Sequence, residues 1–300
     1  MKLDTISIEN SSVRVVLSSY GGKIISLFNK VNSSEWLFQS EKEDICPAED
    51  GSFTKEVAFG SDEMFPTIIK EESVQADGSV VILPDHGELW SSHWDILSHS
   101  TDSVEMRFDG NLLPYRFVRN ILLSENSVIC RYTVVNLSDS DFPALWTPHP
   151  LFSFHPESEI KVPGECRSIT QAGNGGDLGL YLNTVEWGEN GEVPGAGKLL
   201  RPGTLKEGSA YKFYCTEPLS KGEFILKDRR GSLTMSYPAG ILPWLGFWIN
   251  KGGFGGDYNL APEPATAPFD SPSRSEGFGI PAVWKAGEIR EWEVSYTLDA

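Results

Sequence analysis

The amino-acid sequence predicts an all-β protein, a sandwich of two large twisted antiparallel sheets with a concave face. Three observations support this prediction. Polar and apolar residues alternate with period two along many segments, polar turns separate several of these segments, and no window of about 12 residues repeats apolar positions at helical spacing. The 29 glycines and 19 prolines gather in long loops, which on a β scaffold usually carry function.

The expected strands are rich in Val, Ile, Phe, Tyr, Trp and Thr. They occupy residues 13–17, 22–28, 79–83, 103–109, 115–123, 127–135, 223–227, 231–237 and 289–298. Polar turns at 124–127 and 228–231 predict antiparallel hairpins in a mainly up-and-down order. Strand signals run along the whole chain without a repeat or a linker, so residues 1–300 are interpreted as one domain.

Charge limits the partners that the chain could bind. The sequence has 42 acidic and 25 basic residues, a net charge of −17, spread along all 300 positions. Such a surface argues against nucleic acid, which needs clustered Lys and Arg, and favours neutral or cationic ligands. The N-terminal residues alternate like a strand, and no apolar run approaches the roughly 18 residues of a membrane helix. We therefore expect a soluble, cytoplasmic protein without a membrane partner.

The four cysteines, Cys46, Cys130, Cys166 and Cys215, lie far apart and form no CxxC pair. This spacing predicts neither a dense disulfide framework nor a cysteine zinc site. Cys130 lies within an alternating apolar segment, which predicts a buried free thiol.

Two ionisable residues have a proline on each side. His149 lies between Pro148 and Pro150, which stiffen the backbone as an acid-base group requires, although a structural histidine at a strand end would fit equally well. Glu263 has the same flanking pattern in apolar surroundings. A carboxylate there either faces solvent or lies in a pocket that tunes its pKa.

Together with other segments, these residues resemble the aldose 1-epimerase (galactose mutarotase-like) family. The matching segments, in family order, are Gly21-Gly22-Lys23-Ile24-Ile25-Ser26-Leu27, Asp85-His86-Gly87-Glu88-Leu89-Trp90, Trp146-Thr147-Pro148-His149-Pro150, and residues 242–250 followed by Ala261-Pro262-Glu263-Pro264. The resemblance extends over nearly the whole chain. It implies a galactose mutarotase-like supersandwich with its site on a concave face, and a reaction that needs no cofactor and no metal.

The implied reaction interconverts the α and β anomers of an aldohexose. The C1 hydroxyl must lose a proton while the ring oxygen gains one, so one base and one acid suffice. By resemblance Glu263 is the catalytic base, His149 is the catalytic acid, and His86 holds the substrate. A small monosaccharide is the expected partner.

Four further residues are expected to contact the sugar. Sugar sites combine polar groups with aromatic platforms, so Trp90 and Trp248 are candidates, with core packing as the alternative. Asp62 and Glu63 lie where many family members have a polar substrate-contacting loop. The arginine-bearing loop of the galactose mutarotases is missing there, which leaves the preferred sugar open.

Three other interpretations fit parts of the sequence. A hexose-6-phosphate 1-epimerase would need an arginine cluster, for which Arg116 and Arg119 are candidates. A non-catalytic carbohydrate-binding protein could use the same scaffold. A metal enzyme could use His86, His149 and Glu263 as a facial triad, although the chain has no HxH or HExxH pair. The oligomeric state stays open.

Overall fold

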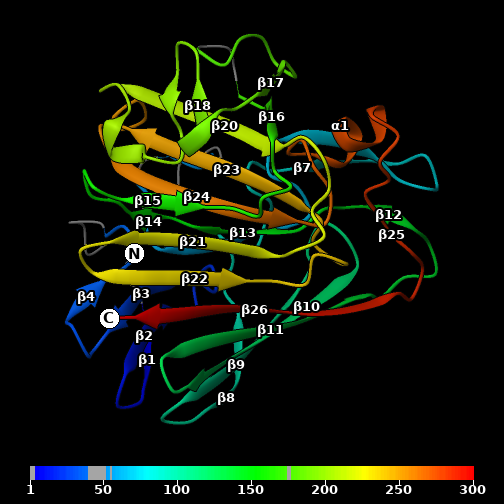
Figure 1. Ribbon diagram of the computed structural model, residues 1–300. Helices are drawn as coiled ribbons and strands as arrows, with labels where there is room; N and C mark the ends of the chain where they lie inside the picture. Colours follow the sequence, from blue (N-terminus) through cyan, green and yellow to red (C-terminus); the bar gives the residue numbers. More distant parts are fainter. Residues whose placement is uncertain (1–3, 40–51, 55, 174–176) are drawn as a thin grey trace.

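The structure is a computed structural model that describes residues 4–39, 52–54, 56–173 and 177–300. In these residues antiparallel strands predominate, with one short α-helix, α1 (Pro272–Gly277), and two single-turn 3₁₀ helices, η1 (Glu189–Gly191) and η2 (Pro202–Thr204) (Figure 1). The predicted all-β antiparallel fold is therefore confirmed. The expectation for Cys46 falls outside the described residues.

An eight-stranded sheet forms one layer of the fold. Its strands, in spatial order, are β15 (Glu159–Lys161), β21 (Glu223–Asp228), β22 (Gly231–Ser236), β26 (Ile289–Asp299), β11 (Ser127–Asn136), β10 (Tyr115–Ser124), β9 (Ser103–Asp109) and β8 (Asp95–His99). Along β10 every second side chain is buried from Tyr115 to Leu123, which is the period-two pattern of a sheet with one face on the core. Both predicted hairpins are confirmed, since β10 pairs with β11 and β21 pairs with β22.

Two six-stranded sheets form the rest of the scaffold. The first contains β1 (Thr5–Glu9), β2 (Val13–Ser18), β3 (Ile24–Asn29), β5 (Ser61–Met64) and β13 (Thr147–Pro150), with β4 (Ser34–Glu35) beside β3. The second contains β14 (Phe152–Ser153), β24 (Tyr258–Ala265), β23 (Trp244–Lys251), β20 (Ser209–Cys215), β16 (Ser168–Gln171) and β17 (Thr184–Glu186). Short pairs join β6 (Glu71–Val74) to β7 (Val80–Leu83), β12 (Phe142–Pro143) to β25 (Val283–Trp284), and β18 (Glu192–Val193) to β19 (Gly197–Lys198).

The described residues thus form three large sheets where the sequence predicted two. The two six-stranded sheets meet where β13 contacts β24. The strand that pairs with β13 through backbone hydrogen bonds is β5 of the first sheet. On β24 the pairing with β14 reaches only Asn259 and Leu260, and proline follows at 262 and 264. Because proline has no backbone N–H, Pro262 and Pro264 cannot donate to a further strand at the edge beyond β14, whereas the pairing of β24 with β23 continues through both. The junction of the two sheets therefore lies at the proline-flanked residues His149 and Glu263.

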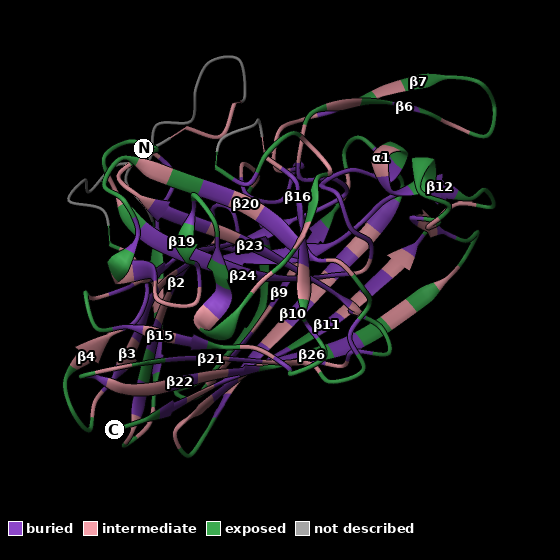
Figure 2. Cartoon of the chain, turned by 45° about the horizontal axis from the view of Figure 1, so that its top comes forward, coloured by how far each residue is buried: buried purple, intermediate pink, exposed green. Residues whose placement is uncertain are grey.

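One continuous apolar core joins the layers. It includes Val15 of β2, Phe117 of β10, Phe247 of β23 and Trp292 of β26, all buried. Figure 2 shows β23 and β24 buried along most of their length, while the β6–β7 hairpin projects from the body. The strands at the sheet junction are therefore anchored on the core, which gives their side chains a rigid support.

Candidate active site

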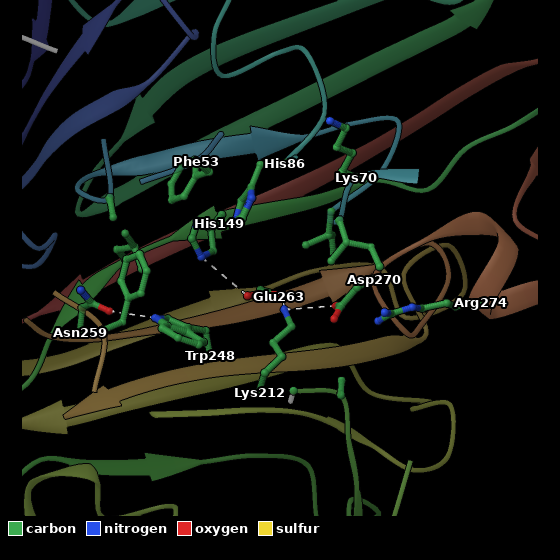
Figure 3. A pocket seen from close by; sticks show the side chains of 17 residues that line it. Phe53, Lys70, His86, His149, Lys212, Trp248, Asn259, Glu263, Asp270 and Arg274 are labelled. Atoms are coloured by element: carbon green, nitrogen blue, oxygen red, sulfur yellow. Dashed lines mark hydrogen bonds and ion pairs between the residues drawn. The ribbon is translucent and has the colours of Figure 1, made fainter. Parts of the chain in front are cut away.

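A cavity of about 530 Å³ opens at the sheet junction (Figure 3). This volume lies within the range of roughly 300–1,000 Å³ typical of small-molecule sites. Four of the seven predicted site residues line it: Glu263, His149, His86 and Trp248. They come from β24, β13, the loop after β7, and β23, so the cavity brings together segments that are far apart in the sequence.

Glu263 and His149 face each other across the junction. The Nε2 atom of His149 lies 3.8 Å from Oε1 of Glu263, and both side chains are buried. Glu263 forms one row across the sheet with Gly246 and Tyr214. A Cβ atom at Gly246 would lie 2.8 Å from the ring of Tyr214, so only glycine leaves room for the ring beside Glu263.

Burial shifts the pKa values of this pair toward each other. It raises the pKa of Glu263 above the usual value, and it lowers the pKa of His149 well below the usual value, with help from the positive charges of His86 and Lys212. The pH range in which Glu263 is ionised while His149 is protonated is therefore narrower than the reference values for Glu and His would give.

His86 is held in a left-handed turn. Its φ is 61°, and Gly87 follows with φ 71°, where a Cβ atom would come within 2.0 Å of the Phe65 carbonyl oxygen. The Nδ1 atom of His86 lies 3.0 Å from Oδ1 of Asp85, and its ring stacks on Phe53 with centroids 4.0 Å apart. Nδ1 faces Asp85, and among the described residues the Nε2 atom of His86 has no hydrogen-bond partner, so it can meet a ligand.

Trp248 lines the cavity on β23 and is partly exposed there. Its Nε1–H donates to Oδ1 of Asn259 at 3.1 Å, which fixes the ring orientation. A ring with one satisfied polar edge and an open face can pack against the C–H face of a sugar.

Lys212 of β20 is a cavity residue that the sequence analysis did not identify. Its ammonium group forms an ion pair with Oε2 of Glu263 and lies 3.4 Å from Oδ1 of Asp270. Burial alone would lower the pKa of Lys212, but the charges of Asp270 and Glu263 outweigh it, and the pKa is raised. Tyr214 completes the network by donating to Asp270 at 2.7 Å.

Asp62 and Glu63 do not line the cavity, so its lining gives no support to the expected polar substrate loop, which stays a prediction. Both belong to β5, whose four residues are all buried. Asp62 pairs with Lys23 at 2.6 Å, and Glu63 pairs with Arg119 at 2.8 Å. A buried carboxylate needs a positively charged partner, and the partners of these two carboxylates, Lys23 and Arg119, lie outside the cavity lining.

Trp90 and the two candidate phosphate-binding arginines also lie outside the cavity lining. Trp90 is buried, donates its Nε1–H to the Asp85 carbonyl at 3.0 Å, and thus supports the turn that carries His86. Arg119 is buried against Glu63, and Arg116 pairs with Asp109 at the surface. Sugar contact by Trp90 stays a prediction, and the two arginines form no cluster at the cavity of the kind that the hexose-6-phosphate alternative would need.

In the part of the chain that the structure describes, no helix is long and apolar enough to cross a membrane. Within the same residues, no group of three or more His, Cys, Asp or Glu side chains is arranged to hold a metal ion.

Comparison with solved structures identifies the fold. A protein from Synechocystis sp. PCC 6803 aligns with a TM-score of 0.76 at 16% identity, covering 100% of this chain and 96% of that one. A galactose mutarotase related enzyme from Lactobacillus acidophilus aligns at 0.68 and 16% identity, covering 99% and 98%. The GalM/aldose epimerase homologue from C. elegans aligns at 0.63 and 14% identity, covering 99% of each chain.

These likenesses show that the chain has the galactose mutarotase-like fold. No protein-family model and no curated protein sequence matches the chain.

Proposed function

We propose that this protein is an aldose 1-epimerase that interconverts the α and β anomers of a monosaccharide by ring opening and reclosure. The observation that carries the proposal is the juxtaposition of Glu263 and His149, 3.8 Å apart and buried in one cavity. A base and an acid at this separation can serve two oxygens attached to the same anomeric carbon. The fold shared with mutarotase-related enzymes supports the proposal.

In the proposed reaction Glu263 accepts the proton of the C1 hydroxyl. The electron pair of that O–H bond forms the carbonyl, the bond between C1 and the ring oxygen breaks, and His149 delivers a proton to the departing ring oxygen. Rotation about the C1–C2 bond exposes the other carbonyl face, and the reverse transfers close the ring. His86, held by Asp85, donates a hydrogen bond to the substrate.

Lys212 supports the base in this mechanism. Its ammonium group favours the ionised form of Glu263, against the effect of burial. Asp270 shares the ammonium group, so Lys212 is held at two points and keeps the carboxylate oriented.

The test is polarimetry of freshly dissolved α-glucose and α-galactose with the wild-type protein and with Glu263→Gln. We expect the variant to lose roughly 10²- to 10⁴-fold in kcat, because the amide keeps the shape but cannot accept a proton. Glu293→Gln, which removes an exposed carboxylate paired with Arg131 on the eight-stranded sheet, should leave the rate unchanged. If Glu263→Gln keeps more than about a tenth of kcat, Glu263 is not the base.

A non-catalytic carbohydrate-binding protein is the alternative in a different class. It would bind sugars in the same cavity without accelerating anomer exchange. Wild-type protein that binds aldoses in calorimetry, yet leaves their mutarotation at the buffer rate, would establish this alternative.

A further inference from the structure

We infer that Asp62 is a positioning residue for His149. Its Oδ1 atom accepts the Nδ1–H of the imidazole, directly or through one buried water, so that Nε2 is the ring atom that exchanges a proton with the substrate. This inference rests on the proposed function for the role of His149 as the acid. It gives Asp62 a role that needs no contact with the ligand.

The pairing of two strands brings Asp62 and His149 together. Strands β5 and β13 are antiparallel, and Asp62 is the cross-strand partner of His149. Directly opposed residues project from the same face of a sheet, with Cβ atoms about 4.5–5.5 Å apart. Oδ1 of an aspartate and Nδ1 of a histidine are both bonded to Cγ. The two atoms are therefore equally many bonds from the backbone and stand at similar height above the sheet.

Asp62 and Glu63 project from opposite faces of β5. Glu63 points to the eight-stranded sheet, where it pairs with Arg119 of β10. Because successive side chains of a strand alternate between faces, Asp62 points the other way, to the side on which His149 lines the cavity. Figure 3 shows the imidazole of His149 directed at Glu263, which Nε2 faces. Nδ1, the ring nitrogen nearer the backbone, is thus left for the neighbouring strand.

Neither of the two atoms has another partner in the described part of the chain. There, Nδ1 of His149 and Oδ1 of Asp62 are buried and form no hydrogen bond. An unpaired buried polar atom is costly, and such atoms are rare in native proteins. On these two opposed residues one atom can donate and the other can accept. A small rotation of the imidazole, or one water held between the two atoms, would satisfy both.

Lys23 fixes the carboxylate of Asp62 without using Oδ1. Its Nζ atom lies 2.6 Å from Oδ2 of Asp62 and also donates to the carbonyl oxygens of Val57 at 3.1 Å and Phe59 at 2.7 Å. An ammonium group has three N–H donors, so these contacts use all of them. Asp62 is therefore held at one oxygen, and its other oxygen is an acceptor of defined position.

The proposed acid needs such an acceptor because its surroundings oppose a charged imidazole. The charged and titratable groups around the ring are His86 of the loop after β7, Lys212 of β20, Lys23 beside β3, Glu263 of β24 and Asp62 of β5. Burial lowers the pKa of His149, and the positive charges among these groups lower it further. A carboxylate that accepts from Nδ1 acts in the opposite direction, since it favours the imidazolium.

The same contact determines which nitrogen of His149 transfers the proton. With Nδ1–H held by Asp62, the imidazolium gives its Nε2 proton to the ring oxygen of the sugar. The ring is then neutral, with its remaining proton on Nδ1 and a lone pair on Nε2. This is the form that takes the proton back when the sugar ring recloses.

The first experiment is ¹⁵N NMR of the wild-type protein labelled at histidine, without substrate. Among the five histidines, the resonances of His149 are those that His149→Gln lacks. At a pH above the pKa of His149, where the ring is neutral, we expect its proton on Nδ1. A neutral ring with its proton on Nε2 overturns the inference, because Asp62 could not then accept from Nδ1.

The second experiment titrates His149 by NMR in the double variant Lys23→Met with Asp62→Asn, which leaves no unpaired buried charge. Loss of the lysine alone would raise the pKa of His149, whereas loss of an accepting carboxylate would lower it. We expect a net fall of about 1 or more. The alkaline limb of the pH profile of kcat/KM should move to lower pH with it. An unchanged or raised pKa of His149 would mean that the pair only supports packing.

Two further variants complete this test. Asn at position 62 can still accept a hydrogen bond, so the proton should stay on Nδ1, whereas Lys23→Met with Asp62→Leu should lose that preference. A Leu variant that keeps it would contradict the inference. Asp228→Asn with Arg230→Met is the matched control, since it removes a buried ion pair of 2.7 Å outside the cavity lining. The titration of His149 should not change in it.

The NMR measurements need no turnover, so they separate this inference from the proposed function. A proton on Nδ1 that depends on residue 62, in a protein that does not accelerate anomer exchange, would sustain the contact between Asp62 and His149 and overturn the epimerase. Accelerated exchange by a protein whose neutral His149 carries its proton on Nε2 would sustain the epimerase and overturn the role of Asp62.

Discussion

At the residue scale, the chemistry of the site depends on how buried charges are balanced. Glu263, Lys212 and Asp270 form a buried network in which one ammonium group serves two carboxylates. His149 contacts this network while its own pKa is held low by burial and by nearby cations, including Lys212. The same lysine therefore influences both of the groups proposed to transfer protons.

Lys212→Met gives a prediction about pH. Lys212 lowers the pKa of Glu263 by favouring the carboxylate, and it lowers the pKa of His149 by opposing a second positive charge. Removing it raises both pKa values. The pH profile of kcat/KM, bell-shaped for an ionised base and a protonated acid, should therefore shift as a whole to higher pH. The two limbs belong to the coupled pair and are compared as a pair.

The control for this shift is Lys251→Met, which removes a lysine of neighbouring β23 that pairs with Glu207 outside the cavity lining. Its profile should stay in place. A Lys212→Met protein with reduced kcat but an unmoved profile would mean that Lys212 only supports the local packing.

At the element scale, β5 is a buried strand whose acidic residues hold the scaffold together. Glu63 accepts from Arg119 of β10 at 2.8 Å, from the Tyr132 hydroxyl of β11 at 3.0 Å, and from the Trp146 indole at 2.9 Å. The eight-stranded sheet is thereby tied to the strand that lies beside β13 and His149. Placement of the proposed catalytic pair thus depends on a network outside the cavity lining.

Glu63→Gln should destabilise the fold by about 3–5 kcal/mol, because it leaves the buried Arg119 without its counter-charge. Urea unfolding followed by tryptophan fluorescence measures the loss. Replacing both partners, Glu63→Leu with Arg119→Met, should cost less than Glu63→Gln alone, since no unpaired charge remains. A stable Glu63→Gln protein with a raised KM would instead restore the substrate-contact role expected from the sequence.

At the scale of the whole molecule, a disulfide links Cys166 to Cys215 of β20, 49 residues apart in the sequence. The wide spacing of the cysteines did not predict this bond, whereas the buried free thiol of Cys130 is confirmed. Disulfides are typical of oxidising compartments. The cytoplasmic location expected from the sequence stays a prediction, and this bond argues against it.

The disulfide should stabilise the protein by about 2–4 kcal/mol, because it limits the freedom of the unfolded chain. Thermal unfolding with and without reductant measures this effect, and Tm should fall on reduction. In the double variant Cys166→Ala with Cys215→Ala, Tm should already be lowered and should not respond to reductant. A wild-type Tm that reductant leaves unchanged would argue that the bond does not form in solution.

The sequence by itself determined the β class and six strands of the eight-stranded sheet, while its two outer strands, β8 and β15, were not predicted. Segments such as 115–123 and 127–135 bury one face and expose the other to a more polar environment, so their alternation is visible in the residue order. The proline-flanked residues His149 and Glu263 also drew attention in the sequence, since proline marks stiff backbone locally, but their expected roles came from the family resemblance.

Only the tertiary structure decided which charged side chains form ion pairs with each other. The strands β20, β23 and β24 were not predicted as strands, because they bury residues on both faces and therefore lose the alternation. Lys212 lies between Tyr211 and Phe213. A lysine between two apolar residues is also what a strand shows when that lysine faces solvent, so the sequence does not distinguish the two cases. Asp62 and Glu63 are polar and were expected to contact a ligand, but the fold buries both of them in ion pairs. A charge is solvated or paired according to what the fold packs against it, and that depends on residues far away in the chain.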